Sequence, residues 1–225
     1  MADAAKPRLP VVVLISGRGS NLQSIMDAVE PGGLPIEIRA VISNRPDADG
    51  LRRATHAGIT TRIIDHTGYD NRGAFDDALM ATIDGFEPAL VILAGFMRIL
   101  TPGFVRHYHG RLLNIHPSLL PDFPGLNTHA RAIEAGRGEH GASVHFVTEE
   151  TDGGPVVAQV YVPVYAGDDP QILAGRVLAG EHRLYPLVIG WFAGGRLSLQ
   201  DDRPLLDGEP LESPRRFTPD ELPMT

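Results

Sequence analysis

The alternation of short β-branched apolar runs with amphipathic helical patterns in the first half of the chain constrains its fold more than any other feature. Runs of Val, Ile and Leu predict strands, and apolar residues three or four positions apart predict helices that bury one face. Strands that alternate with helices favour βαβ units, in which neighbouring strands run parallel. We expect strands at 11–15, 36–42, 62–64, 90–93 and 112–115, and helices at 20–29, 47–57 and 71–83.

The second half of the chain follows a different pattern. Strand-like segments at 143–147 and 156–164 precede a long helical pattern at 172–191, within which Pro186 should bend or restart the helix. Together the two halves predict an α/β fold. Its central sheet should be Rossmann-like and mainly parallel, with helices on both faces and later strands that are partly antiparallel.

The end of the chain combines a hairpin pattern with a charged, Pro-rich tail. The segments 196–200 and 203–206 are expected to pair with each other. The residues beyond them carry many prolines and charges, a composition typical of poorly ordered termini. Because there is no internal repeat and no linker, we expect a single domain over residues 1–206 and a loose tail over 207–225.

The composition is that of a folded globular protein. The 225 residues, 43% of them hydrophobic and 21% charged, suffice for a sizeable α/β core. The apolar runs are shorter than the roughly 18 residues that a membrane-spanning helix needs. No apolar stretch of signal-peptide length precedes the first expected strand, so we expect a cytoplasmic protein without membrane contact.

Cysteine content and net charge narrow the chemistry. Because the chain has no Cys, disulfides, thiolate zinc sites and a cysteine nucleophile are excluded, and nine histidines remain for proton chemistry. The formal net charge of −8 disfavours nucleic acid as a partner, since such proteins concentrate Lys and Arg. A small anionic substrate is compatible with this charge because it needs only a local positive site.

A glycine-rich loop follows the first expected strand and opens the first helix. Residues 16–21 read Ser-Gly-Arg-Gly-Ser-Asn, at a position where backbone N–H groups and the helix dipole bind anions. The third glycine of a dinucleotide site and the Lys of an ATPase loop are both missing. The loop therefore predicts a small phosphate site with Gly19, Ser20 and Asn21 as donors. In the alternative, Ser20 only caps the helix, with Gln23 as its capping-box partner.

Asn114 and His116 lie together at the end of an expected strand. Since side chains alternate along a strand, these two share one face and Ile115 packs on the other. Open α/β sheets bind their ligands at the carboxyl ends of such strands. An amide beside an imidazole, with no Ser or Cys nucleophile obviously placed, suits stabilisation of an oxyanion better than covalent catalysis. A single histidine is more often structural, but this setting favours a functional one.

Two further segments are candidates for the same site. Asp152 lies in the turn Thr-Asp-Gly-Gly-Pro, where an Asp usually bonds to its own backbone. It gains a catalytic role only if it meets His116, because a neighbouring carboxylate favours the imidazolium. Residues 95–100 follow an apolar strand and could form the wall of a pocket for a flat heterocycle. In the alternative, core packing continues past the strand and Arg98 is solvated.

Several segments, in order along the chain, resemble the glycinamide ribonucleotide formyltransferase family. The likeness extends from about Val11 to Leu206, and its motifs lie at 16–22, 94–100, 113–121, 139–147 and 152–155. The Asn-x-His pattern with a distant Asp is shared by several folate-dependent formyl transferases and hydrolases. It therefore specifies the formyl chemistry but not the acceptor, and the Gly-Ser-Asn segment is what points to glycinamide ribonucleotide.

The resemblance implies a formyltransferase fold that acts in purine biosynthesis on glycinamide ribonucleotide and 10-formyltetrahydrofolate, without a metal requirement. It implies Asn114, His116 and Asp152 as the catalytic residues. By the same resemblance, the residues that bind the ribosyl phosphate substrate are Gly19, Ser20, Asn21 and, at the ribose or glycinamide end, Glu181. The implied folate-binding residues are Arg72, Met97, Arg98, Ile99, Leu100, Asn114, Thr148, Thr151 and Asp152.

The same motifs leave other functions open. A formyltetrahydrofolate hydrolase would use water in place of the amine, but such hydrolases usually carry a regulatory domain before the catalytic one, and little chain precedes Val11. An enzyme that formylates initiator tRNA would need a nucleic-acid-binding domain and more positive charge. A non-enzymatic folate or phosphate binding module would have no use for the three catalytic residues together.

Two positions depart from the family pattern. Arg18 stands between the loop glycines where many relatives have a polar amide or Thr, and Asn127 replaces a His that is often found there. The first adds positive charge to the loop, and the second puts any proton role of that position in doubt. The sequence leaves open whether residues 121–139 form a moving lid, and it leaves open the oligomeric state, a homodimer included.

Overall fold

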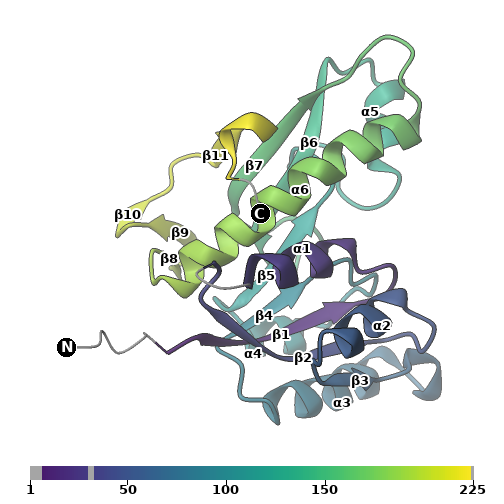
Figure 1. The fold of residues 1–225 in the computed structure, drawn as a ribbon, viewed down its shortest axis with the longest axis vertical. Coiled ribbons are helices and arrows are strands. Elements are labelled where there is room, and N and C mark those ends of the chain that lie inside the picture. Colours follow the sequence, from purple (N-terminus) through teal and green to yellow (C-terminus); the bar gives the residue numbers. More distant parts are fainter. Residues whose placement is uncertain (1–6, 30–32, 224–225) are drawn as a thin grey trace.

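A mixed eight-stranded sheet forms the centre of the computed structural model, which describes residues 7–29 and 33–223 (Figure 1). Its strands are β1 (Leu9–Ile15), β2 (Ile36–Ser43), β3 (Thr61–Ile63), β4 (Leu90–Leu93), β5 (Leu112–His116), β6 (Glu139–Phe146), β7 (Val156–Pro163) and β11 (Arg215–Phe217). The helices are α1 (Ser20–Val29), α2 (Asp49–His56), α3 (Arg72–Asp84), α4 (Pro102–His107), α5 (Thr128–Glu134) and α6 (Pro170–Ala193), with short 3-10 helices η1 (His66–Gly68) and η2 (Pro219–Glu221). Every strand and helix predicted from the sequence is present, with ends that differ by a few residues, whereas α4 and α5 were not predicted.

The strand directions confirm the predicted mainly parallel sheet. The order across the sheet is β11-β7-β6-β5-β4-β1-β2-β3. Strands β1 to β5 pair in parallel, and β6 runs antiparallel to both of its neighbours, β5 and β7. The later strands are therefore partly antiparallel, as expected.

The point that positions the site is the reversal of strand order at β1. The chain leaves β1 through α1 to reach β2 on one side, and later enters β4 on the other side of β1. In open α/β sheets, ligands bind outside the carboxyl ends of the strands at such a point. The loop after β1 and the segment after β4 therefore emerge side by side, linked by the hydrogen bond from Ser16 N to Gly95 O (3.1 Å).

Two apolar layers cover the two faces of the sheet. Because strand side chains alternate, Val13 packs with α1, α2 and α6, whereas Val12 packs with α3 and the end of α4. On β5, Leu113 and Ile115 belong to the layer that contains α6. This confirms that Asn114 and His116 project from the opposite face of the sheet.

Helix α6 is continuous through Pro186, so the predicted restart does not occur. A proline inside a helix removes one backbone hydrogen bond. Here Leu184, Tyr185 and Val188 are fully buried around it, and the Tyr185 hydroxyl donates to Leu93 O and Leu113 O, both at 3.0 Å. Tertiary packing along the sheet thus stabilises the helix across the position that local propensity would break.

The prediction of a loose tail is wrong. The predicted hairpin is present as β8 (Leu197–Gln200) and β9 (Arg203–Leu206), and β10 (Glu209–Pro210) extends it. Beyond it, β11 joins the main sheet parallel to β7, and Leu222 is 2% exposed. The Phe217 and Trp191 rings lie 6.3 Å apart, and the guanidinium of Arg183 donates to the carbonyls of Leu222 and Pro223. A few apolar contacts and an added strand thus order a segment whose composition alone suggests disorder.

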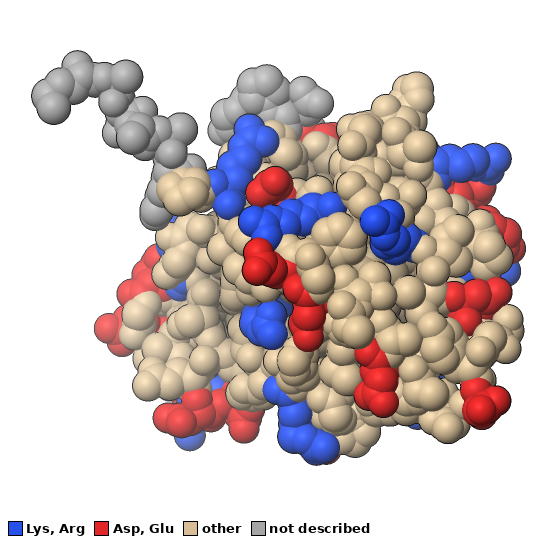
Figure 2. Space-filling view, turned by 90° about the horizontal axis from the view of Figure 1, so that it is seen from below, with Lys and Arg blue, Asp and Glu red and all other residues tan. Residues whose placement is uncertain are grey.

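The surface carries charges of both signs. Figure 2 shows acidic and basic side chains interspersed over one face. Within residues 7–29 and 33–223, none of the helices has the length and apolarity required to cross a bilayer.

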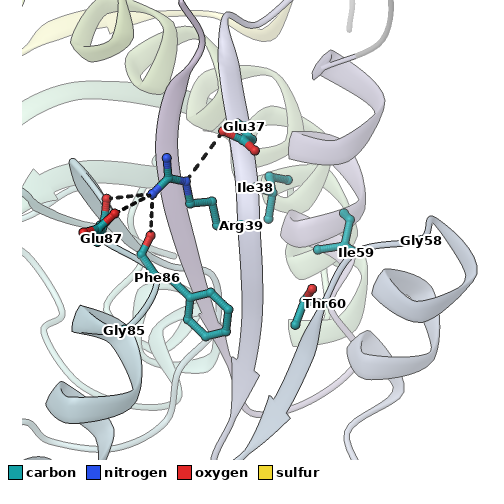
Figure 3. A pocket seen from close by; sticks show the side chains of 9 residues that line it. All are labelled: Glu37, Ile38, Arg39, Gly58, Ile59, Thr60, Gly85, Phe86 and Glu87. Carbon is teal, nitrogen blue, oxygen red and sulfur yellow. Dashed lines mark hydrogen bonds and ion pairs between the residues drawn. The ribbon is translucent and has the colours of Figure 1, made fainter.

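An open hollow of about 470 Å³ lies at the amino ends of the strands, away from the edge formed by their carboxyl ends (Figure 3). Arg39 lines it together with Glu37, Thr60, Phe86 and Glu87. The Arg39 Nη1 donates to Phe86 O (2.8 Å) and Glu87 O (3.3 Å), and the guanidinium also lies near the carboxylates of Glu37 and Glu87. Its cation is thus already engaged by the protein itself.

Candidate active site

The anion loop, residues 16–21, lies at the carboxyl end of β1. Gly19 has φ +71°, and a Cβ placed on it would lie 2.6 Å from Gly50 Cα, so only glycine fits this close approach. Helix α1 begins at Ser20, and Gly19 O accepts from Gln23 N at 2.9 Å. The Gln23 side chain donates to Asp27 Oδ1 (2.8 Å), and its Oε1 accepts from Arg53 Nη1 (3.3 Å) rather than from the backbone of Ser20. The capping-box alternative for Ser20 is therefore wrong, and α1 begins just beyond the carboxyl end of β1.

Asn21 and Glu181 form a buried polar contact beside this loop. Asn21 Nδ2 donates to Glu181 Oε2 at 2.6 Å, which joins α1 to α6. Burial raises the pKa of Glu181, while the hydrogen bond from Asn21 acts in the opposite direction. Asn21 Oδ1 is buried and has no hydrogen-bond partner among the described residues. Since buried polar atoms are normally paired, this oxygen is a candidate acceptor for a ligand.

His116 and Asp152 meet in space, which the sequence could not establish. His116 Nδ1 lies 3.4 Å from Asp152 Oδ2, and His116 Nε2 lies 3.1 Å from Phe123 O. Asp152 has φ +54°, and its Oδ2 also accepts from Gly125 N at 2.8 Å. The carboxylate thus connects the turn after β6 to the loop after β5. An imidazolium at this position would have an acceptor for each of its N–H groups.

Asn114 contacts a residue that the sequence analysis missed. Its Nδ2 lies 3.1 Å from His145 Nε2, and His145 Nδ1 lies 2.9 Å from Phe146 O. His145 is 2% exposed, and burial lowers its pKa to about 4. The signal that could have found His145 is its pairing with Asn114 across β5 and β6. That pairing depends on strand register, which the sequence does not give.

Residues 95–100 expose apolar side chains at the same edge. Met97 is 65% exposed and Ile99 56% exposed, whereas Leu100 packs partly against the core. The Arg98 guanidinium lies 5.7 Å from the centre of the Phe75 ring. These exposures contradict the alternative in which core packing simply continues past β4, and they suit the wall of a pocket for a flat ring.

The remaining predicted folate residues lie on two elements. Thr151 lies in the same turn as Asp152, and Thr148 lies just before that turn, where its Oγ1 donates to Glu150 O at 3.4 Å. Arg72 is the first residue of α3 and is exposed. Helix α3 is tied to the end of residues 95–100 because Asp76 Oδ2 accepts from Thr101 N at 2.6 Å. Among the residues that the structure describes, no hydrogen bond or ion pair joins Arg72 to the turn at Asp152.

The two residues that depart from the family pattern, Arg18 and Asn127, are both described by the structure. Asn127 is the N-cap of α5 with φ +57°, a conformation that Asn tolerates well. Arg18 is exposed, and its carbonyl accepts from Arg53 Nε at 2.9 Å. Within the described part of the chain, no group of three or more His, Asp or Glu side chains is placed to hold a metal ion.

The chain matches the family model described as formyl transferase over residues 9–189, and it belongs to this enzyme family. It is 54% identical over 211 residues to the phosphoribosylglycinamide formyltransferase of Escherichia coli K12. This match covers 94% of this chain and 99% of that protein. It is 48% identical over 201 residues to the enzyme of the same name from Haemophilus influenzae, covering 89% and 95%.

A solved structure shows the same similarity. The phosphoribosylglycinamide formyltransferase of Coxiella burnetii, solved in complex with CHES, matches with a TM-score of 0.90 and 53% identity. The match covers 93% of this chain and 99% of that one. Membership of the family implies a folate-derived formyl donor.

Proposed function

We propose that the protein transfers the formyl group of 10-formyltetrahydrofolate to the amine of glycinamide ribonucleotide, in de novo purine biosynthesis in the cytoplasm. The name shared by the bacterial relatives supports this acceptor. The observation that carries the proposal is the 3.4 Å approach of His116 Nδ1 to Asp152 Oδ2, with Asn114 on the same face of β5. A module that only binds folate or phosphate has no use for this group.

The anion loop takes the phosphate of the acceptor. The N–H groups of Gly19 and Ser20 lie at the N-terminus of α1, where the helix dipole adds to their attraction for an anion. Asn21 Nδ2 is already bonded to Glu181, so the Asn21 side chain offers its Oδ1 as an acceptor. Asn21 and Glu181 therefore bind hydroxyl or N–H groups at the ribose or glycinamide end.

Residues 95–100, named here the folate segment, and the turn at Asp152 hold the donor. The side chains of Met97, Ile99 and Leu100 offer apolar surface to the pteridine, and Arg98 lies between them. Thr148 and Thr151 contact it from the facing turn, and Arg72 binds the anionic glutamate tail. Charge-assisted contacts of a guanidinium with carboxylates are among the stronger polar interactions.

Asn114 and His116 stabilise the charge that develops during transfer. The amine attacks the formyl carbon, a new C–N bond forms, and the formyl oxygen becomes an oxyanion. The second amide proton of Asn114 and the Nε2–H of protonated His116 bind it, with the oxygen replacing Phe123 O. Asp152 stabilises the imidazolium and, with a bound water, passes the amine proton to the folate nitrogen as its bond to carbon breaks.

A deformylation assay separates the proposal from its alternatives. The protein is mixed with 10-formyltetrahydrofolate, with or without glycinamide ribonucleotide, and release of tetrahydrofolate is followed. Release that depends on the acceptor supports the proposal. Equal release in buffer alone indicates a hydrolase, and binding of both compounds without release indicates a binding module.

The variant His116→Ala tests the assigned site. Loss of an oxyanion donor is expected to lower kcat by roughly 10² to 10³-fold. The matched control is His109→Ala, whose side chain is 52% exposed and pairs with Asp202. A near-normal kcat in His116→Ala would remove His116 from the mechanism.

A further inference from the structure

Ser16, the first residue of the anion loop, is bonded directly to the folate segment. Its hydroxyl accepts a hydrogen bond from Met97 N at 2.8 Å and donates to Asn44 Oδ1 at 2.5 Å. Its backbone N–H donates to Gly95 O at 3.1 Å. Ser16 is 5% exposed, so these bonds lie inside the protein, where they hold the partners more firmly than at the surface.

On the other side of Ser16, the anion loop is seated closely on α2. Gly17 O accepts from Gly50 N at 3.0 Å, and Gly19 approaches the backbone of Gly50 at positive φ. A loop that binds an anion through converging N–H groups must adopt one arrangement, and a bound phosphate stabilises that arrangement. Fixing the loop therefore fixes Ser16 as well.

The folate segment starts at the two groups that Ser16 holds. Gly95 turns the chain at φ +78°, and Met97 follows with its side chain exposed to the pocket edge. The far end of the segment is held separately, by the bond from Thr101 N to Asp76. The position of Met97 is thus set through the residue that also begins the anion loop.

We propose that Ser16 is a positioning residue that couples the two substrate sites, so that binding of the ribosyl phosphate strengthens binding of the folate. The hydroxyl holds Met97 N in the place that the ordered anion loop defines, and either ligand reduces the cost of ordering for the other. By linkage the effect is reciprocal. This inference rests on the proposed function, because it takes the two ligands from it.

The coupling is measured as a ratio of dissociation constants. Tetrahydrofolate, which carries no formyl group to transfer, is titrated calorimetrically into the protein with and without saturating glycinamide ribonucleotide. In the unaltered protein, the acceptor is expected to tighten tetrahydrofolate binding about fivefold or more, within the usual range of coupling between sites. In Ser16→Ala the ratio is expected to fall to about one.

Matched variants separate coupling from general loosening. Ser16→Thr keeps the hydroxyl and is expected to keep the ratio. Ser43→Ala removes the hydroxyl of another buried serine, which donates to Arg45 O, and it should leave the ratio unchanged. If Ser16→Ala does not fold, Ser16→Cys replaces it, because a thiol is a poor acceptor for Met97 N. A merely structural role for Ser16 would weaken both affinities without changing the ratio.

The outcomes keep this inference separate from the proposed function. If the unaltered protein shows acceptor-dependent deformylation but its ratio is one, or if Ser16→Ala retains the ratio, the coupling role is wrong and the function stands. If deformylation does not depend on the acceptor, the proposed function itself fails. Loss of the ratio in Ser16→Ala alone supports the role of Ser16.

Discussion

The side-chain amide of Asn114 lies 3.1 Å from Nε2 of His145, its pairing partner on the neighbouring antiparallel strand. Burial lowers the pKa of His145 to about 4, so the ring is neutral at neutral pH. Its Nδ1 faces Phe146 O at 2.9 Å and must carry the proton, which leaves Nε2 as an acceptor. One amide proton of Asn114 is thereby held, and the other can be directed at an oxyanion.

Replacing His145 should impair turnover more than binding. In His145→Leu the Asn114 amide loses its acceptor, and kcat is expected to fall roughly tenfold to a hundredfold, because a small misplacement of an oxyanion donor is costly. KM for both substrates should change little. Steady-state kinetics on the variant give both constants, with His109→Leu as a surface control. A raised KM with unchanged kcat would mean that His145 only shapes a binding surface.

The sequence could predict the parts of this site that depend on residues close together along the chain, and not those that depend on contacts between distant segments. Asn114 and His116 could be placed on one face because strand alternation is local, and the anion loop because it lies between one strand and one helix. His145 could not be placed, because its contact with Asn114 is set by the register of two strands separated by a long loop. Ser16 was part of a recognised motif, but its bond to Met97 joins segments far apart in sequence.

The same reasoning explains the errors in the fold. Pro186 favours a bend or a restart of the helix on local grounds, and the restart does not occur because the buried side chains around it keep α6 continuous. The tail was expected to be loose because proline and charge dominate its composition. Its order comes from long-range contacts of Phe217 and Leu222, which no local pattern of a few residues reveals.

The Glu181 carboxylate is predicted to lower the free energy of unfolding at neutral pH, although it contributes to the binding of glycinamide ribonucleotide. Burial raises its pKa above the ordinary 4.5, so the stability linked to its protonated form is present at low pH and is lost as the pH rises through the raised pKa. Glu181→Gln should therefore be more stable than the parent at neutral pH, by about 1 kcal/mol. KM for glycinamide ribonucleotide should rise roughly tenfold, a change of about 1.4 kcal/mol.

Urea unfolding and steady-state kinetics at pH 7 and above measure both effects in the same preparation. Glu212→Gln, at an exposed position of the same residue type, is the matched control. Lower stability of Glu181→Gln at neutral pH would contradict the argument from burial.

Leu222 is predicted to stabilise the fold without taking part in catalysis. It is 2% exposed and belongs to the core layer that contains α6, so Leu222→Ala should lower the free energy of unfolding by about 2 to 3 kcal/mol. The kcat of the folded enzyme should remain close to that of the parent. Denaturant unfolding compared with Ile172→Ala, which alters a residue 52% exposed, checks this. A loss no larger than that of the control would mean that the tail is not held by this contact.

A last prediction concerns acid stability and His140. This residue is 1% exposed, its Nε2 lies 3.2 Å from His129 Nδ1, and the Phe123 ring packs edge-on at 6.1 Å. Burial, with the neighbouring His129 as a smaller cause, lowers the pKa of His140 from 6.5 to about 4. The unfolded chain therefore binds more protons than the folded one between these values, and stability should fall as the pH drops from about 6.5 to about 4.

The variant His140→Gln keeps a donor for the carbonyl of Pro117. Its loss of unfolding free energy between about pH 6.5 and about pH 4 should be smaller than that of the parent by on the order of 1 to 2 kcal/mol. Urea unfolding at several pH values gives the slope for each protein. Parallel curves for the variant and the parent over this range would show that His140 is not a source of the acid sensitivity. A smaller slope for the variant over this range would assign that part of the acid sensitivity to this buried imidazole.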